Sequence, residues 1–101
     1  MKTFDLFDKD GRLYAFEVEN LQLGRRGLVR VIGTISGATI IRAPLKLFSW
    51  FREEEFCEFA IGERRFVACE PFGDNSRYWI GTKPPGWCPE LAAVRDALRA
   101  W

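Results

Sequence analysis

Three cysteines and a run of glutamates are the side chains whose types could support catalysis. Cys57, Cys69 and Cys88 include no C-x-x-C pair, and Glu58 lies close to the acidic run 53–55. The chain contains no histidine, which excludes Ser-His-Asp and Cys-His catalysis and any zinc site with histidine ligands. It also contains neither the phosphate-binding G-x-x-x-x-G-K-[ST] motif nor the dinucleotide motif G-x-G-x-x-G.

These groups favour structural roles over catalysis. A consecutive glutamate run is typical of a solvated face, and acid–base catalysis by two carboxylates needs both in one pocket. We expect reduced, buried thiols, because free cysteine behaves as a small hydrophobe, and Cys57 and Cys69 face each other across a hairpin if its loop length allows. Cys88 precedes a helix start at Pro89, where a thiol can have a lowered pKa. The sequence therefore predicts no enzyme, no metal and no cofactor, with Cys88 as the best candidate nucleophile.

The turn Phe72-Gly73-Asp74-Asn75 lies between two apolar runs and precedes Arg77. With its flanking strands, over residues 67–81, it resembles the second signature of the Sm-like (Lsm) RNA-binding family, an apolar-Arg-Gly-Asp-Asn turn followed by a short apolar strand. Gly73, Asp74 and Asn75 match, whereas Phe72 replaces the arginine and one extra residue precedes the final strand. The resemblance implies a strongly bent barrel, assembly through edge strands, and an RNA base pocket at this turn.

Two functions remain open. In the first, the domain binds single-stranded RNA at Phe72, Gly73, Asp74, Asn75 and Arg77, with Phe72 stacking on a base and nearby arginines and Lys83 neutralising phosphates. In the alternative, the domain is a protein-interaction or self-assembling module that binds no nucleic acid. The chain has 15 Lys+Arg against 14 Asp+Glu, a net charge of +1. RNA binding therefore requires the basic side chains to share one face; these are Arg25, Arg26, Arg64, Arg65 and Arg77.

The elements that would position these residues are mainly strands. Period-two alternation, β-branched content and turn signals predict strands over residues 3–7, 12–18, 28–34, 38–42, 56–61, 65–70 and 78–81. Gly62-Glu63 is a predicted hairpin turn, and the break before residue 28 is assigned to residues 24–27. Segments 28–34 and 38–42 form either a hairpin or one long strand bent at Gly33 and Gly37. Residues 45–55 are expected to form an irregular or short helical connection.

One helix is predicted, over residues 89–100. Arg95 and Arg99 near its end complement the helix dipole. Its apolar stripe follows helical spacing and comprises Leu91, Val94, Leu98 and Trp101.

The length of 101 residues and the 48% hydrophobic content predict one domain, β-rich over 1–83 and helical over 89–100. We expect a mainly β fold, a small strongly bent antiparallel barrel of the Sm-like or SH3-like kind with five to seven strands. The sequence shows no signal peptide and no apolar run long enough for a membrane helix, so we expect a cytoplasmic protein without a membrane partner. RNA, a second copy of the chain or another protein are the expected partners.

Overall fold

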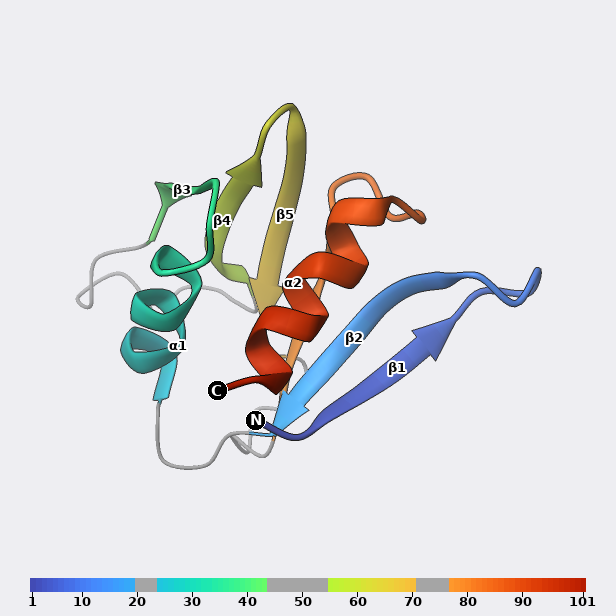
Figure 1. Ribbon diagram of the computed structural model, residues 1–101, viewed down its shortest axis with the longest axis horizontal. Helices are drawn as coiled ribbons and strands as arrows, with labels where there is room; N and C mark the ends of the chain where they lie inside the picture. Colours follow the sequence, from blue (N-terminus) through green and yellow to red (C-terminus); the bar gives the residue numbers. More distant parts are fainter. Residues whose placement is uncertain (20–23, 44–54, 71–76) are drawn as a thin grey trace.

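The computed structural model describes residues 1–19, 24–43, 55–70 and 77–101 (Figure 1). Within these residues the fold is mainly β, with six strands and two helices. No helix in the described ranges is both long and apolar enough to cross a membrane. In chain order the elements are β1 (Thr3–Phe7), β2 (Leu13–Glu19), α1 (Gly24–Gly33), β3 (Ala38–Arg42), β4 (Glu55–Ile61), β5 (Arg64–Cys69), β6 (Arg77–Thr82) and α2 (Pro89–Arg99).

The six strands form one antiparallel sheet in the order β1-β2-β6-β5-β4-β3. The strand number and the C-terminal helix agree with the sequence-based expectation. The sheet is open, however, with β1 and β3 as its two edges, so the expected barrel is not confirmed. The hairpin turn at Gly62-Glu63 is confirmed, and Gly62 has the positive φ of 61° that such turns require.

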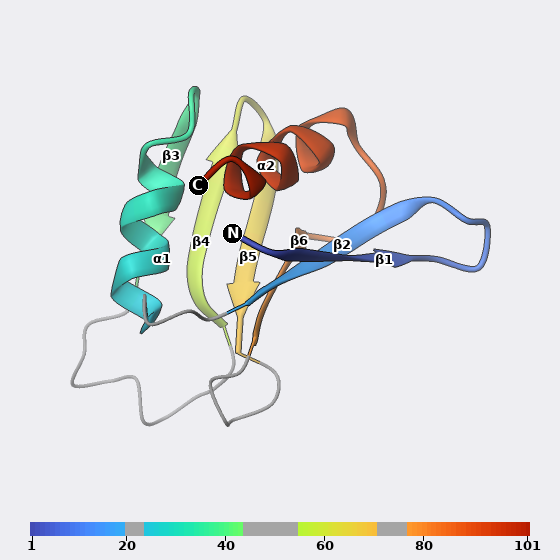
Figure 2. The same ribbon diagram turned by 60° about the horizontal axis from the view of Figure 1, so that its bottom comes forward.

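The hydrophobic core lies between one face of the sheet and both helices. Phe16 and Ile80 are register partners on the central strands β2 and β6, and both are fully buried. They share one core with Leu28 of α1 and Leu91 of α2. Figure 2 shows α1 beside β3, and α2 packs against β2 and β1. We call the covered side of the sheet the inner face and the opposite side the outer face.

The strand expected over residues 28–34 is wrong, because this segment belongs to helix α1. Leu28, Val31 and Ile32 are the buried apolar side chains of α1. They recur at i, i+3 and i+4, which is helical spacing, so α1 buries one stripe against β3 and the core. The β-branched residues favoured a strand on propensity, and the burial of this stripe outweighs that preference. The expected break at residues 24–27 is instead the first turn of α1.

Helix α2 is confirmed at nearly the expected bounds, and Leu91, Val94 and Leu98 are its buried residues. Trp101, expected on the same stripe, lies beyond the helix and is 62% exposed, so that assignment is wrong. Arg95 donates a hydrogen bond to Asp5 of β1 at 2.9 Å. The end of α2 is therefore tied to the edge strand by charge as well as by its apolar stripe.

Both edge strands carry features that hinder pairing with another strand. The register of β1 shifts between Leu6 and Phe7, and that of β3 shifts between Ile40 and Arg42. Asp5 on β1 directs its carboxylate to α2, and Arg42 places a charge on β3. Short, irregular and charged edges are typical of sheets that avoid edge-to-edge association.

Candidate functional site on the outer face

The RNA site expected from the Sm-like resemblance falls largely outside the described residues. Phe72, Gly73, Asp74 and Asn75 all lie there, and so do Glu53 and Glu54 of the acidic run. Arg77 is described, at the start of β6. Its guanidinium donates a hydrogen bond to Glu17 at 3.0 Å and lies 3.7 Å from the ring centroid of Phe4.

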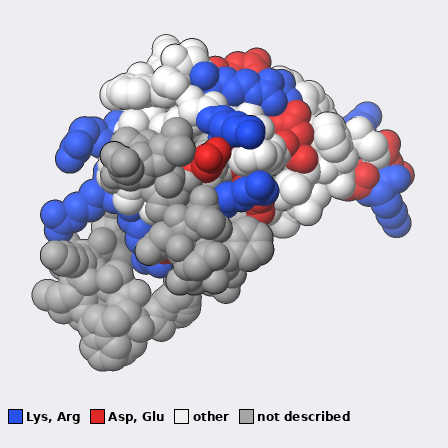
Figure 3. Space-filling model, turned by 90° about the horizontal axis from the view of Figure 1, so that it is seen from below, with Lys and Arg blue, Asp and Glu red and all other residues white. Residues whose placement is uncertain are grey.

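The arginines that RNA binding requires on one face are divided between the two faces of the sheet. Arg25 pairs with Glu70 and lies over the Phe56 ring of the core, and Arg64 reaches Glu90 of α2. Arg65 and Arg77 instead point to the outer face, where they pair with glutamates. Figure 3 shows basic and acidic side chains side by side in its upper part and on its right. No joint basic surface is formed by these arginines.

An apolar centre occupies the middle of the outer face. Ala15, Gly81 and Val67 are register partners on β2, β6 and β5, so their side chains share this face. A Cβ on Gly81 would lie 2.8 Å and 2.9 Å from Cζ3 and Cζ2 of Trp79, and closer still to Cη2. The indole of Trp79 therefore lies directly on the backbone of Gly81, in space that only glycine leaves open. Together with their neighbours on β1 these residues form what we call the apolar centre, comprising Phe4, Leu6, Ala15, Val67, Trp79 and Gly81.

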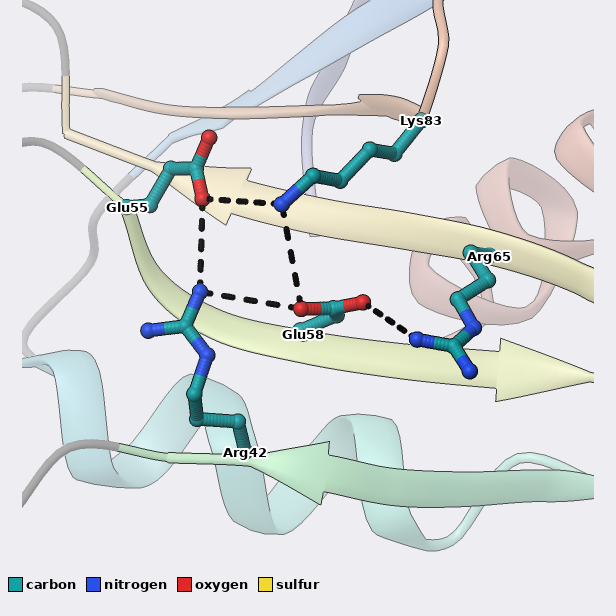
Figure 4. Close-up of polar contacts among 5 residues, drawn as sticks. All are labelled: Arg42, Glu55, Glu58, Arg65 and Lys83. Atoms are coloured by element: carbon teal, nitrogen blue, oxygen red, sulfur yellow. Dashed lines mark hydrogen bonds and ion pairs between the residues drawn. The ribbon is translucent and has the colours of Figure 1, made fainter.

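An ion-pair network flanks the apolar centre on the side of β4 and β3 (Figure 4). Glu58 Oε2 accepts a hydrogen bond from Arg65 at 3.1 Å, and its Oε1 lies 3.6 Å from Arg42 and 3.9 Å from Lys83. Glu55 lies 3.4 Å from Arg42 and 3.7 Å from Lys83, so it belongs to the same network. The hydrogen bond from Arg65 lowers the pKa of Glu58, and the charges of Lys83 and Arg42 act in the same direction. Glu58 is therefore held as a carboxylate rather than as a general acid.

On the other side, Glu17 occupies the position between the two aromatic rings. Phe4, Glu17 and Trp79 are register partners on β1, β2 and β6. Glu17 is only 8% exposed and is neutralised by Arg77, whose guanidinium stacks on Phe4. A hydrogen-bonded arginine stacked on an aromatic ring has little freedom left, so this part of the face is pre-ordered.

A second group of polar side chains lies at the inner side, where α1 begins. Arg25 pairs with Glu70 at the end of β5, and the Glu70 side chain is 5% exposed. Burial raises the pKa of nearby Tyr78, and the charge of Glu70 adds to this effect. Tyr78 itself packs edge-on against Phe56, with 5.1 Å between ring centroids. The ion pair between Arg25 and Glu70 connects α1 to the sheet, which is a structural role.

The three cysteines form no disulfide. Cys57 lies opposite Ala68 and Cys69 opposite Glu55, so the expected facing of the two thiols is wrong. Burial raises the pKa of Cys57 to about 11 and also raises that of Cys88, against the lowered value considered for a helix start. Among the described residues no group of three or more potential ligands could hold a metal ion.

The sequence predicts only part of the outer face. The alternation of β2 and of residues 77–83 marks two faces, but pairing of β2 with β6 brings together residues from opposite ends of the chain. The signal that could have indicated the apolar centre is the order Trp79-x-Gly81, in which a strand glycine leaves space for the aromatic ring two residues before it.

Comparison of the chain with family models, with curated proteins and with solved structures finds no match. The resemblance to the Sm-like family thus stays a prediction from the sequence.

Proposed function

We propose that this chain is a non-enzymatic protein-interaction module that binds a partner protein through the outer face of its sheet. The observation that carries the proposal is the apolar centre, in which the Trp79 indole lies on Gly81 between two sets of ion-paired side chains. Protein interfaces commonly have an aromatic-rich centre and a polar rim, and Trp and Arg are enriched among the residues that dominate binding energy.

Charge supports a protein partner over RNA. Acidic and basic side chains are interspersed on the outer face, and the sequence as a whole has a net charge of only +1. Affinity for RNA depends on arginines and lysines that are available to phosphates. Here Arg42, Arg65 and Arg77 are each neutralised by a glutamate.

The ordering of the face also supports binding. A partner that meets pre-ordered side chains loses less conformational entropy on association than one that meets mobile ones. The stacking of Arg77 on Phe4 and the Arg65–Glu58 hydrogen bond supply this order before any partner arrives.

A photo-cross-linking amino acid at position 6 tests the proposal. Leu6 lies on β1 at the border of the apolar centre, whereas Trp87, the control position, is 42% exposed in the loop before α2. We expect protein adducts from position 6 in living cells, and their loss when Trp79→Ser is added. Adducts to RNA in place of protein, or the same adducts from position 87, would overturn the proposal.

A further inference from the structure

We infer that the exposed side of helix α1 is a second binding surface, which takes a short acidic segment of a partner protein. Helix α1 covers the inner face of the sheet (Figure 2), so this surface is separate from the outer face and does not depend on the proposed function. Three observations carry the inference: the distribution of charge along the chain, two arginines without an ion-pair partner, and the cost of their positions in the helix.

The near-neutral net charge conceals an uneven distribution of charge along the chain. The sequence has no Asp or Glu between Glu19 and Glu53, so all 14 acidic residues lie outside this stretch. Four arginines on α1 and β3 belong to the stretch: Arg25, Arg26, Arg30 and Arg42. Figure 3 shows basic side chains gathered on its left, the side of the molecule on which α1 lies in Figure 1. Segregation of charge along a chain is typical of a surface that binds a partner of opposite sign.

Two of these four arginines are free to contact a ligand. Arg25 is paired with Glu70, and Arg42 belongs to the ion-pair network of Figure 4. Arg26 and Arg30 are exposed and form no ion pair with any described residue. Neither α1 nor the neighbouring strand β3 contains an acidic residue. The positive charge of Arg26 and Arg30 is therefore not offset within these two elements.

The other exposed cations that lack an ion pair have acidic neighbours. Lys9 and Arg12 lie in the turn 8–12 together with two aspartates. Lys2 lies beside Glu19, from whose backbone N–H its carbonyl accepts a hydrogen bond. These cations sit among opposite charges, which distinguishes them from the two free arginines of α1.

The positions of Arg26 and Arg30 do not stabilise the helix. They are spaced i, i+4, so they lie one turn apart on the same side of α1, where like charges repel. Arg26 also lies in the first turn, where the helix dipole disfavours a cation and favours an acidic residue, and α1 has none there. The sequence thus retains positive charge where a neutral or acidic residue would give a more stable helix, as is expected of a functional position.

Size and charge favour a short acidic segment of a protein as the ligand. Arginine side chains bind carboxylates and phosphates through paired hydrogen bonds. Helix α1 has 10 residues and is about 15 Å long. A nucleic acid or a membrane surface would extend beyond it, and outside the acid-free stretch acidic residues outnumber basic ones. A segment with a few carboxylates is instead neutralised within the length of the helix.

Fluorescence anisotropy with a rhodamine-labelled hexaglutamate peptide tests the inference. At about 50 mM salt we expect saturable binding at protein concentrations below about 1 mM, with little binding at about 500 mM salt and none to a hexaglutamine peptide. Replacing both Arg26 and Arg30 by glutamine should weaken binding by about tenfold or more, because two charge-assisted contacts are lost. Replacing both Lys9 and Arg12 by glutamine is the matched control, since it removes the same charge from exposed positions and should weaken binding by less than about threefold.

Each outcome supports or overturns the inference. Equal losses in the two double variants would mean attraction by net charge alone and would overturn the α1 surface, as would absence of binding to hexaglutamate. Tighter binding to hexathymidylate, or to vesicles with about 30% phosphatidylserine, would overturn the acidic protein segment as the ligand. Thermal unfolding should give the Arg26→Gln/Arg30→Gln variant a Tm at least as high as that of the wild type, so a lower Tm would contradict the cost assigned to these charges. The cross-linking experiment at position 6 decides the outer face independently.

Discussion

Replacing Gly81 by alanine is expected to destabilise the protein, although glycine in a strand is usually the less stable residue. The backbone of Gly81 does not have a positive φ, so alanine meets no conformational strain there. Its Cβ would lie 2.8 Å from Cζ3 of Trp79, where ordinary carbon contacts are about 3.5 Å. The indole must move by roughly 1 Å or leave the face.

The magnitude follows from two opposing effects. Gly→Ala in a strand normally gains about 0.5–1 kcal/mol, mainly because the unfolded chain loses conformational freedom. Overpacking a close contact costs about 1–3 kcal/mol. Subtracting the gain from the cost leaves a net loss of about 0–2.5 kcal/mol, centred near 1 kcal/mol. For a domain of this size the central value lowers Tm by about 4–8 °C.

Chemical unfolding of four proteins measures this effect: the wild type, Gly81→Ala, Trp79→Ala and the double variant. Without the indole the added methyl has space, so Gly81→Ala should be neutral or stabilising in the Trp79→Ala background. The coupling energy should be about 1–3 kcal/mol. Gly86→Ala is the matched control, because no atom lies within 4 Å of its Cβ position. A Gly81→Ala protein as stable as the wild type, with no coupling to Trp79, would refute the close contact of indole and backbone.

Three further predictions concern the ion-pair network, the helix and the thiols. The pKa of Glu58 is lowered in the folded state, so its contribution to stability is present above about pH 4.3 and is lost as the pH falls through the lowered pKa. Glu58→Gln should thus show a smaller loss of unfolding free energy than the wild type between about pH 5 and pH 2 in urea titrations, and an equal loss in the two proteins would contradict the pairing of Glu58 with Arg65. Leu91 is fully buried, and Leu91→Ala should cost about 2–5 kcal/mol in guanidinium unfolding; a loss below about 1 kcal/mol would contradict the packing of α2 on the sheet. Among the cysteines, Cys69 should react first with a thiol reagent at neutral pH and the buried Cys88 only on unfolding, so labelling of Cys88 at the rate of a free thiol would contradict its burial.

Much of the fold follows from local patterns in the sequence. The β4–β5 hairpin was predictable because Gly62-Glu63 separates two alternating runs, and α2 because Pro89 begins a segment with an apolar stripe. Helix α1 was missed because its residues have strand propensity, and only the spacing of Leu28 and Ile32 indicates the helix. Local propensity and burial disagree in this segment, and burial has the larger free energy.

The site was less predictable than the fold. The alternation of β2 separates Glu17 from Phe16, but it does not say which strand lies beside them. The pairing of β2 with β6 creates the row from Phe4 through Glu17 to Trp79, and no local pattern contains that pairing. Arg77 was singled out as an RNA contact, and its carboxylate and aromatic partners come from these distant strands.

The position of β2 in the sheet has a consequence for the order of folding. On one side β2 pairs with β1, its neighbour in the chain, but on the other it pairs with β6, about 60 residues later. During synthesis one edge of β2 therefore stays unpaired until β6 has left the ribosome, when most of the domain has been made. Local hairpins and α1 can form early, whereas we expect the pairing of β2 with β6, which joins distant parts of the chain, to form late and to slow folding. The newly made chain is thus most prone to aggregation in the interval before β6 emerges, and substitutions that speed this closure should raise the yield of folded protein more than their effect on stability predicts.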